Sequence, residues 1–281
     1  MAVWQTTRFR IDLSRPQVMG IVNITPDSFS DGGQHATTQA ALAHCEQLLK
    51  DGADILDLGG ESSRPGAEPL PLEQELARVL PVLRGALSLG VPVSIDTYKP
   101  ETMRAVLDLG ADIVNDIYAL RWPGALQAVA AHPTCGVCLM HRQGEPQSMQ
   151  VKPIYGDVLA EVRQFLAERA TALRSGGVAA ERIALDPGIG FGKTVEHNFA
   201  LLARQPELLA LGYPLLVGWS RKSSLGALTG RPAGERLAAS VAAAMASAQL
   251  GAKVLRVHDV AATVDALKVV GAARLLGHPQ G

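Results

Sequence analysis

Short runs of apolar residues alternate along the chain with longer segments in which apolar residues recur every three or four positions. The longer pattern is typical of amphipathic helices, and the short runs are typical of strands buried on both faces. Leucines follow the helical spacing from Leu72 to Leu87, and Pro81 is expected to kink or split that helix. The eight predicted strands are Val18–Thr25, Asp54–Gly59, Val91–Asp96, Ile113–Ile117, Gly136–Met140, Ile183–Asp186, Pro214–Gly218 and Lys253–Val257.

A weak repeat supports this alternation of helix and strand. A Gly-Ala pair opens the runs that begin at Gly52, Gly110 and Gly251, each time after a helical stretch. Glycine there ends a helix in the left-handed conformation before the chain enters a buried strand. Strands that alternate with helices form a parallel sheet covered on both sides. Eight such units in 281 residues favour a (β/α)8 TIM barrel as a single domain over 1–281, with a doubly wound open sheet as the alternative.

Composition narrows the class of protein. With 47% hydrophobic and 19% charged residues the chain is not of the disordered type, and a net charge of −1 argues against a broad nucleic-acid-binding surface. The sparse cysteines, Cys45, Cys135 and Cys138, favour a reducing compartment, and we interpret the C-x-x-C pair as buried thiols because no second pair accompanies it. No apolar segment is long enough to span a membrane, so a cytoplasmic protein without membrane contact is expected.

Polar residues collect where the apolar runs stop. In a parallel barrel these positions converge on the C-terminal mouth, where the catalytic groups of this fold lie. Asp or Ser after a strand is often only a helix cap, but caps do not explain polar groups after seven of the eight runs. The polar ends are Asn23–Ser28, Glu61–Gly66, Asp96–Thr97, Asn115–Asp116, Asp186–Gly188, Ser220–Ser223 and Arg256–Asp259.

The charges in this ring indicate two kinds of ligand group. Asp96, Asn115 and Asp186 offer acceptors and an amide donor, which suit a planar heterocycle with adjacent N–H groups. A second set is cationic and suits phosphate. The two sets together imply a substrate that joins a heterocycle to a phosphate. Two alternatives remain open: Asp186 as a helix cap, and pairing of Arg256 and His258 with carboxylates such as Asp259. The cationic set is Arg64, Lys222, Arg256 and His258.

A glycine-rich segment from Gly188 to Thr194 looks like a phosphate-binding loop. Its lysine and threonine fit that motif, but Pro187 stands where the motif requires the first glycine. We therefore interpret the segment as a loop that shapes a pocket, with Phe191 as an apolar wall.

The motifs together resemble those of the dihydropteroate synthase family, the folate-pathway enzymes blocked by sulfonamides. The resemblance runs from about Val18 to the C-terminus (about 18–276) in the family's order, with one departure at Ser63, where the family usually has threonine. Serine keeps the hydroxyl and loses a methyl group, so a hydrogen bond survives while local stiffness falls. The matching segments are Met19–Gly33, Gly59–Gly66, Asp186–Thr194, Gly218–Ser223 and Arg256–Asp259.

The resemblance implies a (β/α)8 barrel, a homodimer, and a transferase that joins a dihydropterin diphosphate to p-aminobenzoate with loss of diphosphate. It implies Mg²⁺ as cofactor, held by Asn23. The implied pterin-binding residues are Asp96, Asn115, Asp186, Lys222 and Arg256. The implied diphosphate-binding residues are Ser63, Arg64, Arg256 and His258. The implied p-aminobenzoate pocket is Ser63, Pro65, Phe191 and Ser223. The residues expected to be catalytic are Asp96, Lys222 and Arg256.

The two long loops Thr25–Thr37 and Glu61–Leu70 are expected to order over the substrates and exclude water. Three other functions compete with the synthase: a pterin-binding methyltransferase barrel, an inactive pterin-binding paralogue, and a Schiff-base aldolase that uses Lys222. The methyltransferase would not need the cationic set, and carbonyl chemistry does not explain the acidic and amide residues.

Overall fold

A computed structural model describes residues 3–24, 33–61, 68–144 and 153–276 of the chain. The strands are β1 (Val3–Gln5), β2 (Arg10–Asp12), β3 (Gln17–Asn23), β4 (Ile55–Gly59), β5 (Val93–Asp96), β6 (Ile113–Asp116), β7 (Gly136–Met140), β8 (Ile183–Asp186), β9 (Leu216–Val217) and β10 (Val254–Val257). The helices are α1 (Gly33–Lys50), α2 (Leu72–Ala86), α3 (Pro100–Asp108), α4 (Ala125–Ala131), α5 (Val158–Ser175), α6 (Val195–Ala203), α7 (Pro206–Leu209), α8 (Ser223–Thr229), α9 (Leu237–Gln249) and α10 (Val260–Leu276).

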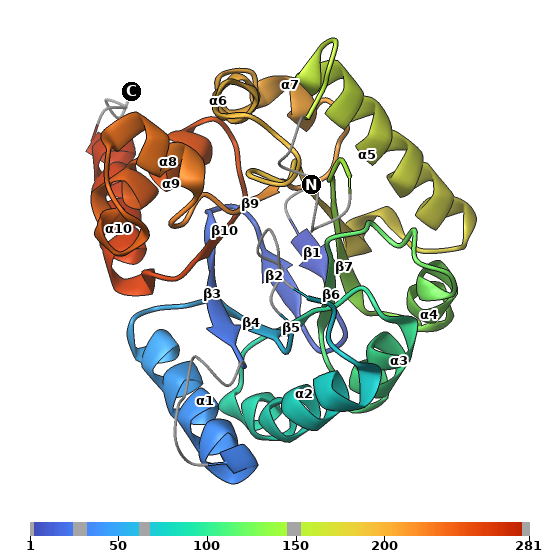
Figure 1. The fold of residues 1–281 in the computed structure, drawn as a ribbon. Coiled ribbons are helices and arrows are strands. Elements are labelled where there is room, and N and C mark those ends of the chain that lie inside the picture. Colours follow the sequence, from blue (N-terminus) through green and yellow to red (C-terminus); the bar gives the residue numbers. More distant parts are fainter. Residues whose placement is uncertain (1–2, 25–32, 62–67, 145–152, 277–281) are drawn as a thin grey trace.

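Strands β3 to β10 form a parallel barrel enclosed by a ring of helices (Figure 1). The strand order is β8-β7-β6-β5-β4-β3-β10-β9, so neighbours in the sheet are neighbours in the chain except where β3 meets β10. The circle closes between β8 and β9, where Leu185 pairs with Leu215 and donates its N–H to Pro214 O at 2.9 Å. The predicted barrel is therefore confirmed, and the open doubly wound sheet is excluded. Gly52, Gly110 and Gly251 each have φ near +100°, as the repeat predicted.

Two local predictions need correction. Helix α2 runs from Leu72 to Ala86 as one helix with Pro81 in its interior, so Pro81 does not split it. Its face of Val79, Val82 and Leu83 is fully buried, and that packing outweighs the hydrogen bond lost at proline. The first long loop is shorter than predicted because α1 already begins at Gly33. Residues 25–32 of that loop, and 62–67 of the second, lie outside the described residues.

A two-stranded hairpin closes the N-terminal end of the barrel. Strands β1 and β2 pair antiparallel, and Figure 1 shows them in the middle of the ring. Trp4, Ile11 and Leu13 are buried in one cluster with residues of the barrel strands such as Met19 and Ile113. The sequence pattern did not predict this hairpin, because its strands have three residues each. The floor of the barrel is thus apolar.

In the part of the chain that the structure describes, no helix is long and apolar enough to cross a membrane.

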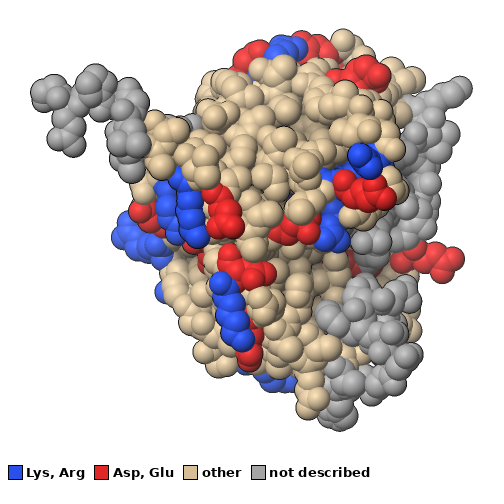
Figure 2. Space-filling model, turned by 90° about the vertical axis from the view of Figure 1, so that its left-hand side faces the viewer, with Lys and Arg blue, Asp and Glu red and all other residues tan. Residues whose placement is uncertain are grey.

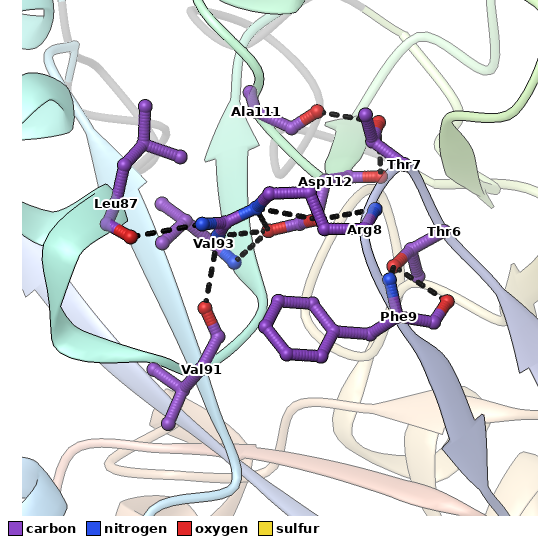
Figure 3. Close-up of polar contacts among 9 residues, drawn as sticks. All are labelled: Thr6, Thr7, Arg8, Phe9, Leu87, Val91, Val93, Ala111 and Asp112. Atoms are coloured by element: carbon purple, nitrogen blue, oxygen red, sulfur yellow. Dashed lines mark hydrogen bonds and ion pairs between the residues drawn. The ribbon is translucent and has the colours of Figure 1, made fainter.

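One ion pair, between the partly exposed Arg8 and the fully buried Asp112, fastens the hairpin to the barrel (Figure 3). The buried carboxylate of Asp112 accepts from Arg8 N at 2.9 Å, from Arg8 Nη2 at 2.6 Å and from Val93 N at 2.9 Å. The same guanidinium donates to Leu87 O at 2.8 Å and to Val91 O at 3.1 Å. Arg8 therefore joins the hairpin to the segment between α2 and β5 and to the start of β6.

We predict that Arg8→Met lowers the free energy of unfolding by roughly 1.5–3 kcal/mol, because the buried Asp112 carboxylate loses its counter-ion, while water at the partly exposed Arg8 side chain keeps the loss below that of a fully buried pair. The matched control is Arg15→Met, which removes an arginine from an exposed pair with Asp54 and should cost at most about 1 kcal/mol. Urea unfolding of both variants measures the difference. Equal losses would contradict the role given to the Arg8–Asp112 pair.

Candidate active site

The strand register places three of the predicted site residues side by side. Asn23 pairs with Gly59, Gly59 with Asp96, and Asp96 with Asn115, across β3, β4, β5 and β6. All four residues lie at the C-terminal ends of their strands, where side chains of a parallel barrel face the mouth. Asp186 is the last residue of β8. The fold thus brings Asn23, Asp96, Asn115 and Asp186 to one end of the barrel.

Arg256 is bound inside this mouth by two carboxylates. It lies in β10, and its Nε donates to Asp57 Oδ2 at 2.6 Å while its Nη2 donates to Asp96 Oδ2 at 2.8 Å. Asn115 Nδ2 donates to the same Asp57 oxygen at 3.3 Å. Carboxylate pairing was the alternative interpretation for Arg256, but the expected partner differs: Asp259 binds Arg221, at 2.7 Å.

Asp57 is a member of the site that the sequence analysis missed. It is fully buried within β4, and no residue that the structure describes donates a hydrogen bond to its Oδ1. A signal was present, since an aspartate stands inside the otherwise apolar run Ile55–Gly59. A buried carboxylate needs a partner, and that requirement would have indicated an arginine or lysine facing it.

Burial and like charge perturb the acidic half of the site. Burial, reinforced by the Asp57 carboxylate, raises the pKa of Asp96 to about 7, although the Arg256 cation lowers it. Burial also raises the pKa of Asp186 above its ordinary value, while a hydrogen bond from Gly188 N at 2.7 Å opposes that shift. Asp186 therefore caps a turn rather than a helix, because the cap of α6 is Thr194. A carboxylate that titrates near neutral pH is a feature of functional sites.

Lys222 and Phe191 contact one another at the edge of the acidic group. The Lys222 ammonium lies 4.1 Å from the centroid of the Phe191 ring, which is a cation–π contact. Burial lowers the pKa of Lys222 to about 8, while the Asp186 carboxylate opposes that shift. Lys222 occupies the cap position of α8, and Ser223 is the first residue of that helix. Residues predicted for the pterin and p-aminobenzoate subsites are thus adjacent.

His258 lies one residue beyond the end of β10 and is held by Ser220. The Ser220 hydroxyl is 2.9 Å from His258 Nδ1 and accepts the His258 backbone N–H at 3.2 Å. Arg221, next to Ser220, adopts φ +60°, which turns the chain sharply before Lys222. The other residues predicted to contact diphosphate or p-aminobenzoate, Ser63, Arg64 and Pro65, lie outside the described residues.

A buried charge network that the sequence analysis also missed supports the end of β5. Lys99 forms ion pairs with Glu61 and, at 2.8 Å, with Glu75. Glu75 Oε1 accepts from the Thr97 hydroxyl at 2.7 Å, which fixes the residue next to Asp96. The sequence carried no signal for this network, because charges on a helix and in loops are usually solvated.

Comparisons with known proteins agree with this geometry. The model of the pterin binding enzyme family matches residues 19–258. The chain is 54% identical over 273 residues to the dihydropteroate synthase of Neisseria meningitidis serogroup B, covering 95% of this chain and 96% of that protein. The crystal structure of Burkholderia cenocepacia dihydropteroate synthase complexed with 7,8-dihydropteroate has a TM-score of 0.90 and 52% identity, covering 98% of both chains. A Xanthomonas albilineans dihydropteroate synthase with 4-aminobenzoic acid has a TM-score of 0.90, 52% identity and 96% coverage of both chains.

The fold, the mouth with its buried acids and half-buried cations, and the family match define a pterin-binding enzyme of the barrel type. Within that class the chain belongs to the dihydropteroate synthase family. The resemblance found in the sequence motifs is thereby confirmed.

We predict that Arg256→Met raises the pKa of Asp96 further above 7, because the Arg256 cation is the neighbour that favours the ionised carboxylate. Titration of the aspartate carboxyl carbons by NMR in the ligand-free protein measures the shift. Arg221→Met, which breaks only the outer pair with Asp259, is the matched control and should leave Asp96 unchanged. An unchanged pKa of Asp96 in Arg256→Met would show that the Arg256 cation does not control the ionisation of this carboxyl group.

Proposed function

We propose that this chain catalyses the dihydropteroate synthase reaction of folate biosynthesis. It condenses 6-hydroxymethyl-7,8-dihydropterin diphosphate with p-aminobenzoate and yields 7,8-dihydropteroate and diphosphate. The observation that carries the proposal is the pairing of buried acid and amide groups with half-buried cations in one barrel mouth, around Arg256. The solved relatives with 7,8-dihydropteroate and with 4-aminobenzoic acid support the same substrates.

The acidic half is suited to the pterin ring. The Asp186 carboxylate matches the adjacent 2-amino and ring N–H donors, and Asn115 and Asp96 supply further acceptors around the ring. The Lys222 ammonium donates to the pterin carbonyl and a ring nitrogen, and the planar guanidinium of Arg256 stacks on the ring. Each of these groups is buried or half-buried, and hydrogen bonds within the protein hold Asp186, Asn115 and Arg256 in place.

The cationic half binds the diphosphate. Arg256 and His258 donate to it from β10 and the residue beyond, and we assign Ser63 and Arg64 to the same group. The amide oxygen of Asn23 is a hard donor of the kind Mg²⁺ prefers, and it would hold the ion together with diphosphate oxygens and water. When bound, the ion supplies positive charge that stabilises the leaving group.

The p-aminobenzoate ring lies beside Phe191, with Ser223 at its edge and Ser63 and Pro65 completing the pocket. In the reaction the bond between the pterin methylene carbon and the diphosphate oxygen breaks, and the aryl nitrogen forms a bond to that carbon and then loses a proton. Asp96, Lys222 and Arg256 contact the pterin while its methylene becomes positive, and the electron-rich ring spreads that charge. An aryl amine is a sufficient nucleophile, so the mechanism needs no strong general base.

The proposal also covers the domain organisation, the cellular compartment and the oligomeric state of the protein. We assign residues 1–281 to one domain, since the barrel spans both ends of the family match. The three cysteines are buried free thiols, which suits the reducing cytoplasm.

The chain also forms a homodimer through α9 and α10, on the side seen in Figure 2, where uncharged residues cover a broad surface between a few charged groups.

A diphosphate-release assay tests the function. Purified protein should release diphosphate from the pterin substrate only when both p-aminobenzoate and Mg²⁺ are present, and 7,8-dihydropteroate should appear in equal amount. Pterin binding without diphosphate release would favour the inactive paralogue. Methyl transfer from a methylated folate, with no diphosphate release, would favour the methyltransferase barrel.

We predict that Asp186→Asn weakens binding of a pterin analogue by roughly 1.5–3 kcal/mol, the usual range for a hydrogen bond to a charged group. The amide replaces one acceptor with a donor that faces the ring N–H. Calorimetry on the ligand-free protein measures the loss, with Asp259→Asn as the control for an aspartate outside the pterin site. Unchanged affinity in Asp186→Asn would remove that residue from the pterin site.

We predict that Val269→Glu shifts the chain from dimer towards monomer. Val269 is 70% exposed on α10, and a charge there would be desolvated in a dimer, which should weaken association about tenfold or more. Light scattering after gel filtration at several concentrations measures the mass. Ile154→Glu makes the same chemical change at an exposed residue before α5 and should not alter the mass. Equal masses in all three proteins would exclude α10 from the interface.

A further inference from the structure

The lysine of the glycine-rich segment has no part in the proposed reaction, and its position is unlike that of a phosphate-binding lysine. Lys193 is only 3% exposed. Its ammonium lies 2.9 Å from Gly188 O, 3.1 Å from Phe191 O and 2.9 Å from His141 Nδ1. These three acceptors match the three N–H donors of an ammonium group. Lys193 is therefore occupied within the protein.

The three acceptors belong to two different loops. Gly188 and Phe191 lie in the loop after β8, and His141 is the residue after β7. Burial, together with the nearby lysine, lowers the pKa of His141 to about 2, so its ring is neutral and its Nδ1 accepts the lysine N–H. The Lys193 side chain therefore joins the two loops by three hydrogen bonds, although burial lowers the pKa of Lys193 to about 7.

The backbone of the glycine-rich segment lies directly against the β7 loop. A Cβ atom at Gly188 would come within 1.8 Å of His141 O, and one at Gly192 within 2.2 Å of Gln143 O. Both glycines also have positive φ, 68° and 64°, which other residues adopt only with strain. The close approach and the lysine together hold the segment in one position.

The side chains that this segment carries or contacts belong to the active site. Phe191 packs on the cluster of Ile117, Tyr118 and Met140 and lies under the Lys222 ammonium. A Cβ at Gly190 would lie 3.1 Å from Lys222 Cδ, so the segment also borders the Lys222 stem. A shift of the segment would move the Phe191 ring and leave Lys222 less well supported.

We propose that Lys193 is a positioning residue, which holds the segment Gly188–Phe191 against the β7 loop and so sets the Phe191 wall of the p-aminobenzoate pocket. The proposal rests on the proposed function, because it concerns the second substrate of that reaction. It differs from a phosphate-binding role, which would act on the pterin diphosphate. It also differs from a merely structural role, which would affect stability and neither substrate in particular.

Steady-state kinetics on the full chain tests the proposal. Lys193→Met should raise the KM for p-aminobenzoate about tenfold or more while the KM for the pterin diphosphate changes less than about threefold. Lys193→Gln keeps part of the hydrogen bonding without the charge and should lie between Lys193→Met and the wild type. Lys50→Met removes an exposed lysine at the end of α1 and is the matched control, with both KM values unchanged.

The other outcomes each overturn the proposal. A selective rise in the KM for the pterin diphosphate would assign Lys193 to the phosphate. Equal rises in both KM values, or unchanged KM values with a lower urea midpoint, would make the lysine merely structural, as would loss of folding in both Lys193 variants. A wild-type chain that releases no diphosphate would instead refute the proposed function, which separates the two failures.

Discussion

The ion pairs of Arg256 with Asp57 and Asp96 are the interaction on which the mouth of the barrel depends. Arginine is charged at any ordinary pH, so a buried guanidinium requires carboxylates close to it. Its partners come from β4 and β5, while Arg256 itself lies in β10. In the sheet order only β3 separates β10 from β4, and β5 is the next strand, so the parallel order of these four strands brings the three side chains together. Removal of Arg256 would leave the buried Asp57 carboxylate without its counter-ion, which costs about 3–5 kcal/mol.

The two ends of the barrel have opposite character, and this explains the perturbed acids and bases. The hairpin closes the N-terminal end with apolar side chains such as Trp4, and polar groups collect at the other end. Burial there raises the pKa values of Asp96 and Asp186 and lowers that of Lys222. These opposite shifts bring the pKa values of the acidic and the basic groups towards neutral pH. The site can then accept from ring N–H groups and donate to a carbonyl or phosphate under the same conditions.

Most of the strands, and the polar residues at their C-terminal ends, could be predicted from the sequence. A buried parallel strand appears in the sequence as a run of apolar residues, and the polar residues at its end interrupt that run. Asp96, Asn115 and Asp186 were placed at the mouth of the barrel in this way. Asp57 was missed because it stands inside a run, and its partner Arg256 is 199 positions away. Local periodicity does not say which side chains face the barrel interior. Pro187 was enough to reject the phosphate-loop motif, but the contacts of Lys193 could not be predicted, because they depend on the path of the neighbouring β7 loop.

Pairing with carboxylates and binding of substrate are compatible roles for Arg256. A guanidinium carries five N–H donors, and the bonds to Asp57 and Asp96 use Nε and Nη2. Donors therefore remain for a diphosphate, while the two carboxylates fix the plane on which a pterin can stack. Much of the conformational entropy of the long Arg256 side chain is then lost when the protein folds rather than when the substrate binds. The ion pair that stabilises the mouth thus also prepares it for the ligand.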